Sequence, residues 1–187
     1  MIWLLRNTPN ILTALRLAAA PALVLLLLNA DYDAALAVFV FAGLSDAADG
    51  YLAKRFKLTT RFGRYLDPAA DKLLMLAAFV TLTHLAFVPF WLTALVIARD
   101  LAIVLGVGLA RMMALPLRVV PLFVGKVSTV VQVSYIALVL LILAAGLDWP
   151  RTALAAAAIA GAATAVSGIA YAQLWFRAFA RSGSTAA

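Results

Sequence analysis

Long apolar runs, separated by short polar breaks, cover almost the whole chain. A helix of about 20 apolar residues crosses a bilayer. Runs of this length predict six transmembrane helices, at roughly residues 10–29, 33–54, 65–84, 90–112, 122–145 and 151–177. The breaks are rich in Gly, Pro, Asn and Asp, which favour turns. The pattern therefore predicts an all-α integral membrane protein with six spans.

The stretch before the first apolar run is predicted to be separate from the first span. Thr8 followed by Pro9 is typical of an N-cap and the first position of a helix, so the first span should begin there. Residues 1–9 include the short amphipathic stretch MIWLLR, which we expect to lie at the membrane interface. No linker divides the rest of the chain, so we expect residues 1–187 to form a single membrane domain.

The composition supports lipid as the solvent of these helices. Hydrophobic residues make up 66% of the chain and charged residues 12%, whereas a typical soluble domain has about 25% charged residues. The chain has no cysteine and one histidine, His84. These counts exclude a disulfide framework and a thiolate nucleophile, and they disfavour a zinc site, which usually needs several His or Cys ligands.

The net charge is +7. We interpret the basic residues as signals of membrane topology and as partners for phosphates or anionic lipid headgroups, and we expect no nucleic-acid partner. The two sets of helix ends differ in charge. One set has Arg151 as its basic residue and also carries acids, whereas the other set is strongly basic and includes Arg6, Lys54, Arg55, Lys57, Arg61, Arg64, Arg111, Arg118, Arg177 and Arg181. The positive-inside rule therefore places both termini and the loop at 54–64 in the cytoplasm.

Half of the eight acidic residues lie in two pairs around this basic loop. Asp46 and Asp49 are three residues apart near the end of the second predicted span. Asp67 and Asp71 are four residues apart near the start of the third. Both spacings put a pair on one helix face. Because the connection is short, we expect the two helices to be antiparallel neighbours whose acidic faces converge.

Such a cluster needs compensation, because one aspartate at the centre of a membrane helix costs about 2.5–3.5 kcal/mol on insertion scales. Hard divalent cations such as Mg²⁺ or Mn²⁺ prefer carboxylate oxygens, and two such ions form a common clamp for phosphoryl transfer. Gly50 and Gly63, just beyond the pairs, would allow close approach of a ligand or a helix. The alternatives are pairing with the loop cations and an ion or proton pathway, which would distribute acids through the bilayer.

The acidic stretch resembles the CDP-alcohol phosphotransferase family. The pattern of that family is D-x-x-D-G-x-x-A-R, eight residues, then G-x-x-x-D-x-x-x-D. This chain matches every spacing with Asp46, Asp49, Gly50, Ala53, Lys54, Gly63, Asp67 and Asp71. It departs from the pattern at Lys54, where the family usually has Arg. The charge is kept but the bidentate fork is lost, and Arg55 is an alternative for that role.

The resemblance implies roles for these residues. The four aspartates would bind two divalent ions, Mg²⁺ or Mn²⁺, that hold the pyrophosphate of CDP-diacylglycerol. Asp71 would also be the general base that activates an alcohol, and CMP would be the leaving product. The nucleotide site implied by the family consists of Asp46, Asp49, Gly50, Ala53, Lys54, Gly63 and Asp67.

Further polar residues inside apolar runs are candidates for an acceptor site. They are Arg99, Asp100, Lys126 and Gln132, with Arg118 in the preceding break. Local pairing explains them as well as acceptor binding does, and Arg16 in the first span is either a cation reaching toward the interface or a further cation for an acceptor phosphate. The stretches PNILTALR, PFWLTALVIARDLAIV and PLFVGKVSTVVQ resemble the branch containing cardiolipin synthase and phosphatidylglycerophosphate synthase. Gly125 and Ser128 stand where cardiolipin synthases are expected to have Ser and Asn.

The resulting prediction is a phospholipid-synthesising transferase in the inner membrane of a bacterium, with its active site facing the cytoplasm. Phosphatidylglycerol, giving cardiolipin, is the first acceptor considered and glycerol 3-phosphate the second. The resemblance also implies a homodimer. Two alternatives from other classes are a carboxylate-coupled transporter and a scaffold that dimerises through Ala157, Gly161 and Ala165.

Overall fold

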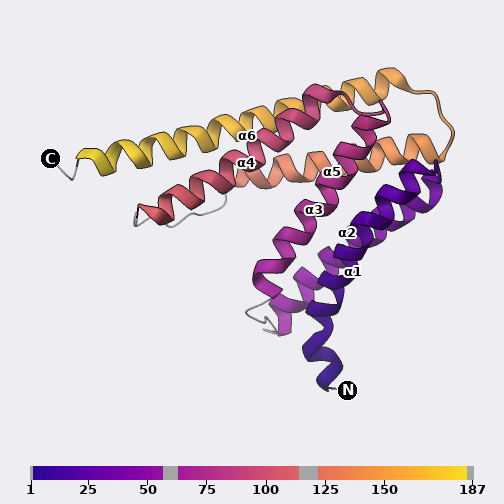
Figure 1. Ribbon diagram of the computed structural model, residues 1–187, viewed down its shortest axis with the longest axis horizontal. Coiled ribbons are helices and arrows are strands. Elements are labelled where there is room, and N and C mark those ends of the chain that lie inside the picture. The colour runs from indigo at the N-terminus through magenta and orange to yellow at the C-terminus, as the bar shows by residue number, and fades with distance from the viewer. Residues whose placement is uncertain (1, 57–62, 114–121, 185–187) are drawn as a thin grey trace. The chain divides into compact units, whose positions relative to one another are not determined.

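Helices account for nearly all of the described chain. A computed structural model describes residues 2–56, 63–113 and 122–184, and side chains within 15–45, 71–113 and 122–177. The helices are α1 (Ile2–Leu28), α2 (Tyr32–Phe56), α3 (Gly63–His84), α4 (Phe90–Met112), α5 (Phe123–Ala144) and α6 (Pro150–Ser184) (Figure 1). The predicted all-α class and six helical segments are confirmed.

The helix bounds differ from the predicted spans chiefly at the two ends of the chain. The predicted helix start at Thr8 and Pro9 is wrong, because α1 is continuous from Ile2. A proline removes a single backbone N–H, and membrane helices tolerate that loss. At the other end, α6 continues to Ser184, past the predicted limit at residue 177.

Three helices end in the same hydrogen-bonded turn. At the end of α1, the N–H of Asp31 donates to Leu26 O at 2.9 Å and that of Ala30 donates to Leu27 O at 3.1 Å. This is the Schellman pattern, which requires a left-handed residue. Ala30 has that conformation with φ 57°, and Ala86 after α3 and Gly146 after α5 have φ 62° and 61°. These turns close the apolar helices and allow the chain to reverse.

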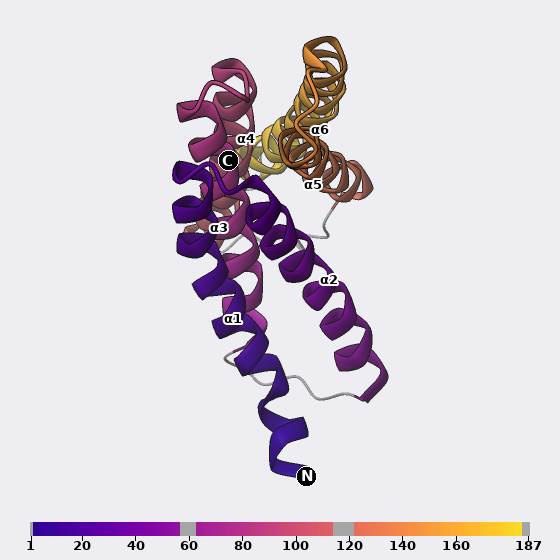
Figure 2. The same cartoon turned by 90° about the vertical axis from the view of Figure 1, so that its right-hand side faces the viewer.

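The chain divides into two compact units. Unit 1 contains α1, α2, α3 and the part of α5 from Ile136 onward. In it, α1 packs against both α2 and α3 (Figure 2). Its fully buried side chains include Leu23, Leu27, Phe79 and Leu82. Helix α1 therefore packs against both helices that carry the acid pairs, α2 and α3.

Unit 2 contains α4, α6 and the part of α5 up to Tyr135. Here α4 packs against α6, and small residues make the approach close. A Cβ at Gly106 would lie 2.3 Å from the ring of Trp175, and one at Gly161 would lie 2.5 Å from the ring of Trp91. The small-residue face around Gly161, a candidate for dimerisation, is thus used within the chain.

Three helices are long and apolar enough to cross a membrane in the part of the chain whose side chains are described. They are Phe90–Met112, Phe123–Ala144 and Pro150–Arg177, and Leu15–Leu28 and Tyr32–Ser45 are shorter apolar segments. These segments support a multi-pass membrane protein. Six complete spans and the cytoplasmic placement of the termini stay predictions.

Candidate active site

The two acid pairs lie on continuous helices. Asp46 and Asp49 belong to α2, and Asp67 and Asp71 belong to α3. Helical backbone confirms that each spacing puts its pair on one helix face. The side chains of Asp46, Asp49 and Asp67 lie outside the described residues, so their convergence with Asp71 stays a prediction.

Asp71 forms an ion pair that joins α3 to α1. Its Oδ1 accepts a hydrogen bond from Arg16 Nη1 at 2.5 Å. The Asp71 side chain is 41% exposed, whereas Arg16 is 3% exposed. A guanidinium buried this deeply in an apolar helix needs an anionic partner. The contact therefore fixes the rotation of α1 against α3 at the acidic segment.

The donor chemistry of the acidic segment fits hard divalent cations. Asp46, Asp49, Asp67 and Asp71 supply carboxylate oxygens, which Mg²⁺ and Mn²⁺ prefer. Asp71 shows that one of these carboxylates is already compensated by a cation, Arg16. Among the side chains that the structure describes, no three His, Cys, Asp or Glu residues cluster, and three of the four candidate ligands lie outside that set.

The remaining candidates for the nucleotide site are placed by their backbone. Gly50, Ala53 and Lys54 lie on α2, as does Arg55, and Gly63 is the first residue of α3. Their side chains, and residues 57–62 of the basic loop, lie outside the described residues. The choice between Lys54 and Arg55 as the phosphate-binding cation stays open.

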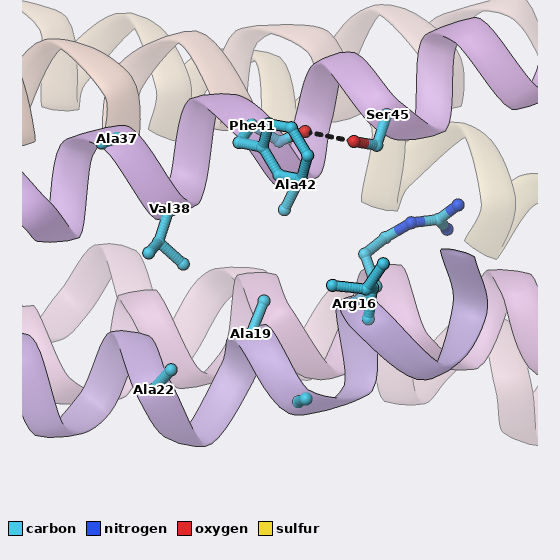
Figure 3. Close-up of a pocket in the computed structure, with 10 residues that line it drawn as sticks. Arg16, Ala19, Ala22, Ala37, Val38, Phe41, Ala42 and Ser45 are labelled. Carbon is cyan, nitrogen blue, oxygen red and sulfur yellow. Dashed lines mark hydrogen bonds between the residues drawn. The ribbon is translucent and has the colours of Figure 1, made fainter. Parts of the chain in front are cut away.

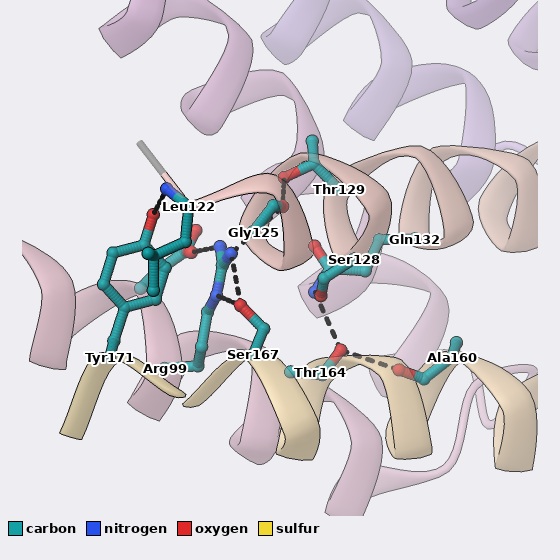
Figure 4. Close-up of polar contacts among 11 residues, drawn as sticks. Arg99, Leu122, Gly125, Ser128, Thr129, Gln132, Ala160, Thr164, Ser167 and Tyr171 are labelled. Carbon is teal, nitrogen blue, oxygen red and sulfur yellow. Dashed lines mark hydrogen bonds and ion pairs between the residues drawn. The ribbon is translucent and has the colours of Figure 1, made fainter. Parts of the chain in front are cut away.

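Arg99, a candidate acceptor residue, lies at the centre of a buried network in unit 2 (Figure 4). Its Nη1 donates to Asp100 Oδ1 at 2.7 Å, and its Nη2 donates to Ser167 Oγ at 2.9 Å and to Gly125 O at 3.2 Å. Its Nε donates to Ser167 Oγ at 3.2 Å. All three guanidinium nitrogens therefore bind groups of the protein itself.

Tyr171 completes this network from α6. Its ring lies 5.7 Å from the Arg99 guanidinium carbon, a cation–π distance, and its hydroxyl accepts the N–H of Leu122 at 3.2 Å. A Cβ at Gly125 would lie 2.9 Å from the Tyr171 hydroxyl oxygen. Gly125 thus leaves room for Arg99 and Tyr171 to hold the first turn of α5.

Gln132 is also directed toward α6. Its Nε2 donates to Thr164 Oγ1 at 2.9 Å and to Ser128 Oγ at 3.3 Å, and Thr164 Oγ1 donates to Ala160 O at 2.7 Å (Figure 4). Ser128 and Thr164 are fully buried. This chain of hydrogen bonds satisfies polar groups between two apolar helices.

Lys126 differs from Arg99 and Gln132 in being exposed. It follows Gly125 in the first turn of α5, so the Arg99–Tyr171 network fixes the backbone on which it sits. Asp100 is half-buried and paired with Arg99. Arg118 lies outside the described residues. Of the candidate acceptor residues with described side chains, Lys126 is thus the cation most accessible to a phosphate.

Sequence reasoning did not assign Arg16 to the acidic segment. The available signal was a charged residue inside an apolar span, which requires a partner, but that partner is 55 residues away. Ser167 and Tyr171 were also missed. They lie four residues apart in α6, on one helix face, after a run dominated by alanine and glycine.

A family model described as CDP-alcohol phosphatidyltransferase matches residues 6–171. This range is most of the chain and contains both acid pairs, so the chain belongs to the CDP-alcohol phosphatidyltransferase family. Membership favours a transferase of this class over the transporter and scaffold alternatives.

Curated relatives carry names from two activities of that family. The chain is 38% identical over 147 residues to cardiolipin synthase (CMP-forming) of Streptomyces coelicolor, covering 75% of this chain and 67% of that one. It is 36% identical over 172 residues to a probable phosphatidylglycerophosphate synthase of Mycobacterium tuberculosis, covering 88% and 79%. It is 34% identical over 145 residues to the rat cardiolipin synthase (CMP-forming), covering 69% of this chain. The chain spans about half the length of the rat protein (48%).

Proposed function

We propose that this protein synthesises phospholipid by transferring a phosphatidyl group from CDP-diacylglycerol to a glycerol-type alcohol, with release of CMP. The observation that carries the proposal is the acidic segment itself. Two acid pairs at the family spacing lie on the two helices that pack against α1, and Asp71 is held there by Arg16. The names of the relatives support the same reaction class.

In the proposed reaction, Asp71 accepts the proton of the acceptor hydroxyl as general base. The hydroxyl oxygen forms a bond to the phosphorus on the lipid side of the pyrophosphate. The bond from that phosphorus to the bridging oxygen breaks, and its electron pair leaves with CMP. Arg16 holds the Asp71 carboxylate in position, because it donates to Oδ1 from a buried site on α1.

The pyrophosphate of the donor needs compensation for its negative charge. Two divalent ions, Mg²⁺ or Mn²⁺, held by Asp46, Asp49, Asp67 and Asp71 would neutralise charge that develops on the departing phosphate. Gly50 and Ala53 leave room beside the nucleotide, and Lys54 or Arg55 contacts its phosphates. The basic residues around the acid pairs favour binding of an anionic donor at this end of the helices.

The proposed acceptor is phosphatidylglycerol, giving cardiolipin, and the second candidate is glycerol 3-phosphate, giving phosphatidylglycerophosphate. Relatives with both names support this choice. Exposed Lys126 is suited to an acceptor phosphate, whichever acceptor is used. We place the enzyme in a bacterial cytoplasmic membrane, with the active site facing the cytoplasm, and propose that it acts as a homodimer.

An acceptor competition tests the reaction and separates the two acceptors. Purified protein receives CDP-diacylglycerol and Mg²⁺ with phosphatidylglycerol, glycerol 3-phosphate or no acceptor, and CMP release is measured. We expect release that is abolished by EDTA and faster with phosphatidylglycerol than with glycerol 3-phosphate. Faster release with glycerol 3-phosphate would reverse the acceptor assignment. If no acceptor gives metal-dependent CMP release, the proposal that the protein catalyses this transfer is overturned.

A further inference from the structure

An apolar groove lies between α1 and α2 in unit 1 (Figure 3). Its volume is about 570 Å³, and it is only partly enclosed. This is within the size range of small-molecule pockets, about 300–1,000 Å³. The groove exists because small side chains face it from both helices. Its described lining residues are Leu15, Arg16, Ala18, Ala19, Ala22, Ala37, Val38, Phe41, Ala42 and Ser45.

The two ends of the groove differ in polarity. Arg16 and Ser45 lie together at one end, whereas Ala22 and Ala37 lie at the other (Figure 3). The other lining side chains are alanine, valine, leucine or phenylalanine. The described lining therefore suits a ligand with one apolar body and one polar end.

The polar end is continuous with the candidate active site. Arg16 is the partner of Asp71, and Ser45 immediately precedes Asp46 on α2. A lipid whose pyrophosphate is held by the acid pairs would therefore have its apolar part beside this groove. The length of the groove also fits an extended acyl chain. From Arg16 at the polar end to Ala22 at the apolar end, α1 rises about 9 Å over six residues.

We propose that this groove binds one acyl chain of the CDP-diacylglycerol donor, an inference that rests on the proposed function. The glycerol end of the lipid lies near Arg16 and Ser45, and the chain runs toward Ala22 and Ala37. A transmembrane helix with side chains is about 10–12 Å across, so a volume of about 570 Å³ would hold less than two of its turns. A single file of methylene groups fits it. Because the groove is only partly enclosed, the chain can enter it and leave with the product.

Blocking the apolar end tests this assignment. Ala22→Phe and, on the opposite helix, Ala37→Phe place a ring in the groove about two helical turns from the polar end. With CDP-dioleoylglycerol as donor, each variant should raise KM by about tenfold, because long chains no longer fit. With CDP-dihexanoylglycerol, whose chains end before the block, KM should stay at the wild-type value. An equal effect on both donors would overturn the proposal.

Val40→Phe is the matched control. Val40 lies on α2, is exposed, and does not line the groove, so the same ring added there should leave KM unchanged with both donors. A chain-length effect in this control equal to that of Ala22→Phe would overturn the assignment. If wild-type protein releases no CMP from either donor, the proposed function fails. If it releases CMP but Ala22→Phe shows no preference for short chains, the groove proposal alone fails.

Varying the acyl chains of the acceptor shows which lipid, donor or acceptor, binds in the groove. In the Ala22→Phe variant with a fixed donor, changing the acyl length of phosphatidylglycerol should not change the rate. Dependence on acceptor length would assign the groove to the acceptor and overturn the donor proposal.

Photolabelling tests occupancy without turnover. CDP-diacylglycerol with a diazirine in one acyl chain should label residues within 18–22 and 37–42, and excess CDP-dioleoylglycerol should prevent the labelling. Labelling that excess donor does not reduce would identify bulk lipid in the groove. Disulfide crosslinking of two copies through cysteines introduced at Ala22 and Ala37, unaffected by donor, would identify a second copy as the occupant. Either result contradicts the proposal.

Discussion

Among the side chains that the structure describes, each unit buries one arginine, and the partners of these two arginines differ. Arg16 in unit 1 is 3% exposed and binds a carboxylate 55 residues away, inside the acidic segment. Arg99 in unit 2 is 8% exposed and binds its neighbour Asp100, a serine hydroxyl and a backbone carbonyl. The first arginine compensates a group with proposed chemistry, whereas the second joins three helices. The two arginines are therefore buried to a similar degree but have different roles, and substitutions of each can separate an effect on activity from an effect on stability.

Removing Arg99 should give the largest loss of stability. Arg99→Met leaves Ser167 Oγ, Gly125 O and the half-buried Asp100 without their cation, and loss of one partner of a buried ion pair costs about 3–5 kcal/mol. Denaturation in detergent micelles should show the loss. KM for the acceptor, measured at a temperature where the variant stays folded, should rise less than in Lys126→Met, because Arg99 acts only through the backbone that carries Lys126.

The opposite outcome would give Arg99 a role in binding instead of stability. Wild-type stability of Arg99→Met together with a strongly raised KM for the acceptor would place Arg99 in the acceptor site. Lys126→Met provides the contrast, because Lys126 is exposed. This variant should retain stability and raise KM for a phosphate-bearing acceptor.

Removing Arg16 should affect activity more than stability. In Arg16→Gln, Asp71 loses its guanidinium, and turnover should fall by roughly a hundredfold because the base is no longer held in place. The free energy of unfolding should fall by about 1–3 kcal/mol, less than in Arg99→Met, because Asp71 is 41% exposed. CMP release and denaturation measured on one preparation test both effects. Turnover at the wild-type rate would remove Arg16 from the active site.

Gly125 and Tyr171 should behave as a coupled pair. Gly125→Ala introduces a methyl group 2.9 Å from the Tyr171 hydroxyl oxygen, and overpacking of this kind costs about 1–3 kcal/mol. Tyr171→Phe removes that oxygen, so the double variant should be more stable than the sum of the two single changes predicts. Unfolding temperatures of the four proteins give the coupling. Strict additivity would contradict the contact.

The smallest loss of stability should come from a substitution at Gly146, which follows the end of α5 and contacts neither arginine site. Gly146 has φ 61°, a left-handed conformation that alanine adopts at a cost of about 1–2 kcal/mol. Gly146→Ala should therefore lower the unfolding temperature slightly while CMP release per folded molecule stays unchanged. A large loss of activity would show that general stability limits turnover, and the contrast between Arg16 and Arg99 would then lose its meaning.

The sequence predicted the helices well because bilayer thickness and turn residues set their lengths. The bounds of α2, α3, α4 and α5 agree with the predicted spans within about two residues. The start of α1 was wrong, since Pro9 was interpreted as a first helical position although α1 continues through it. Local residue preference is a weak guide where a helix can continue on either side.

The partners of the buried polar residues were harder to predict. Spacing gave the helix faces of Asp67 and Asp71, but the contact between Asp71 and Arg16 depends on how α1 rotates against α3. Gly125 was noticed as a departure from the expected motif, and its physical reason, the hydroxyl of Tyr171, appears only once α5 and α6 are placed. Contacts between distant segments follow from packing, which periodicity does not encode.

In the proposed reaction, Asp71 of the acidic segment takes the proton of the acceptor. The most direct test compares wild-type protein with Asp71→Asn in metal-dependent CMP release from CDP-diacylglycerol, with donor binding measured on the same preparations. Turnover should fall by at least about a hundredfold in Asp71→Asn, while donor binding is largely retained. Wild-type turnover by Asp71→Asn would contradict this role of Asp71.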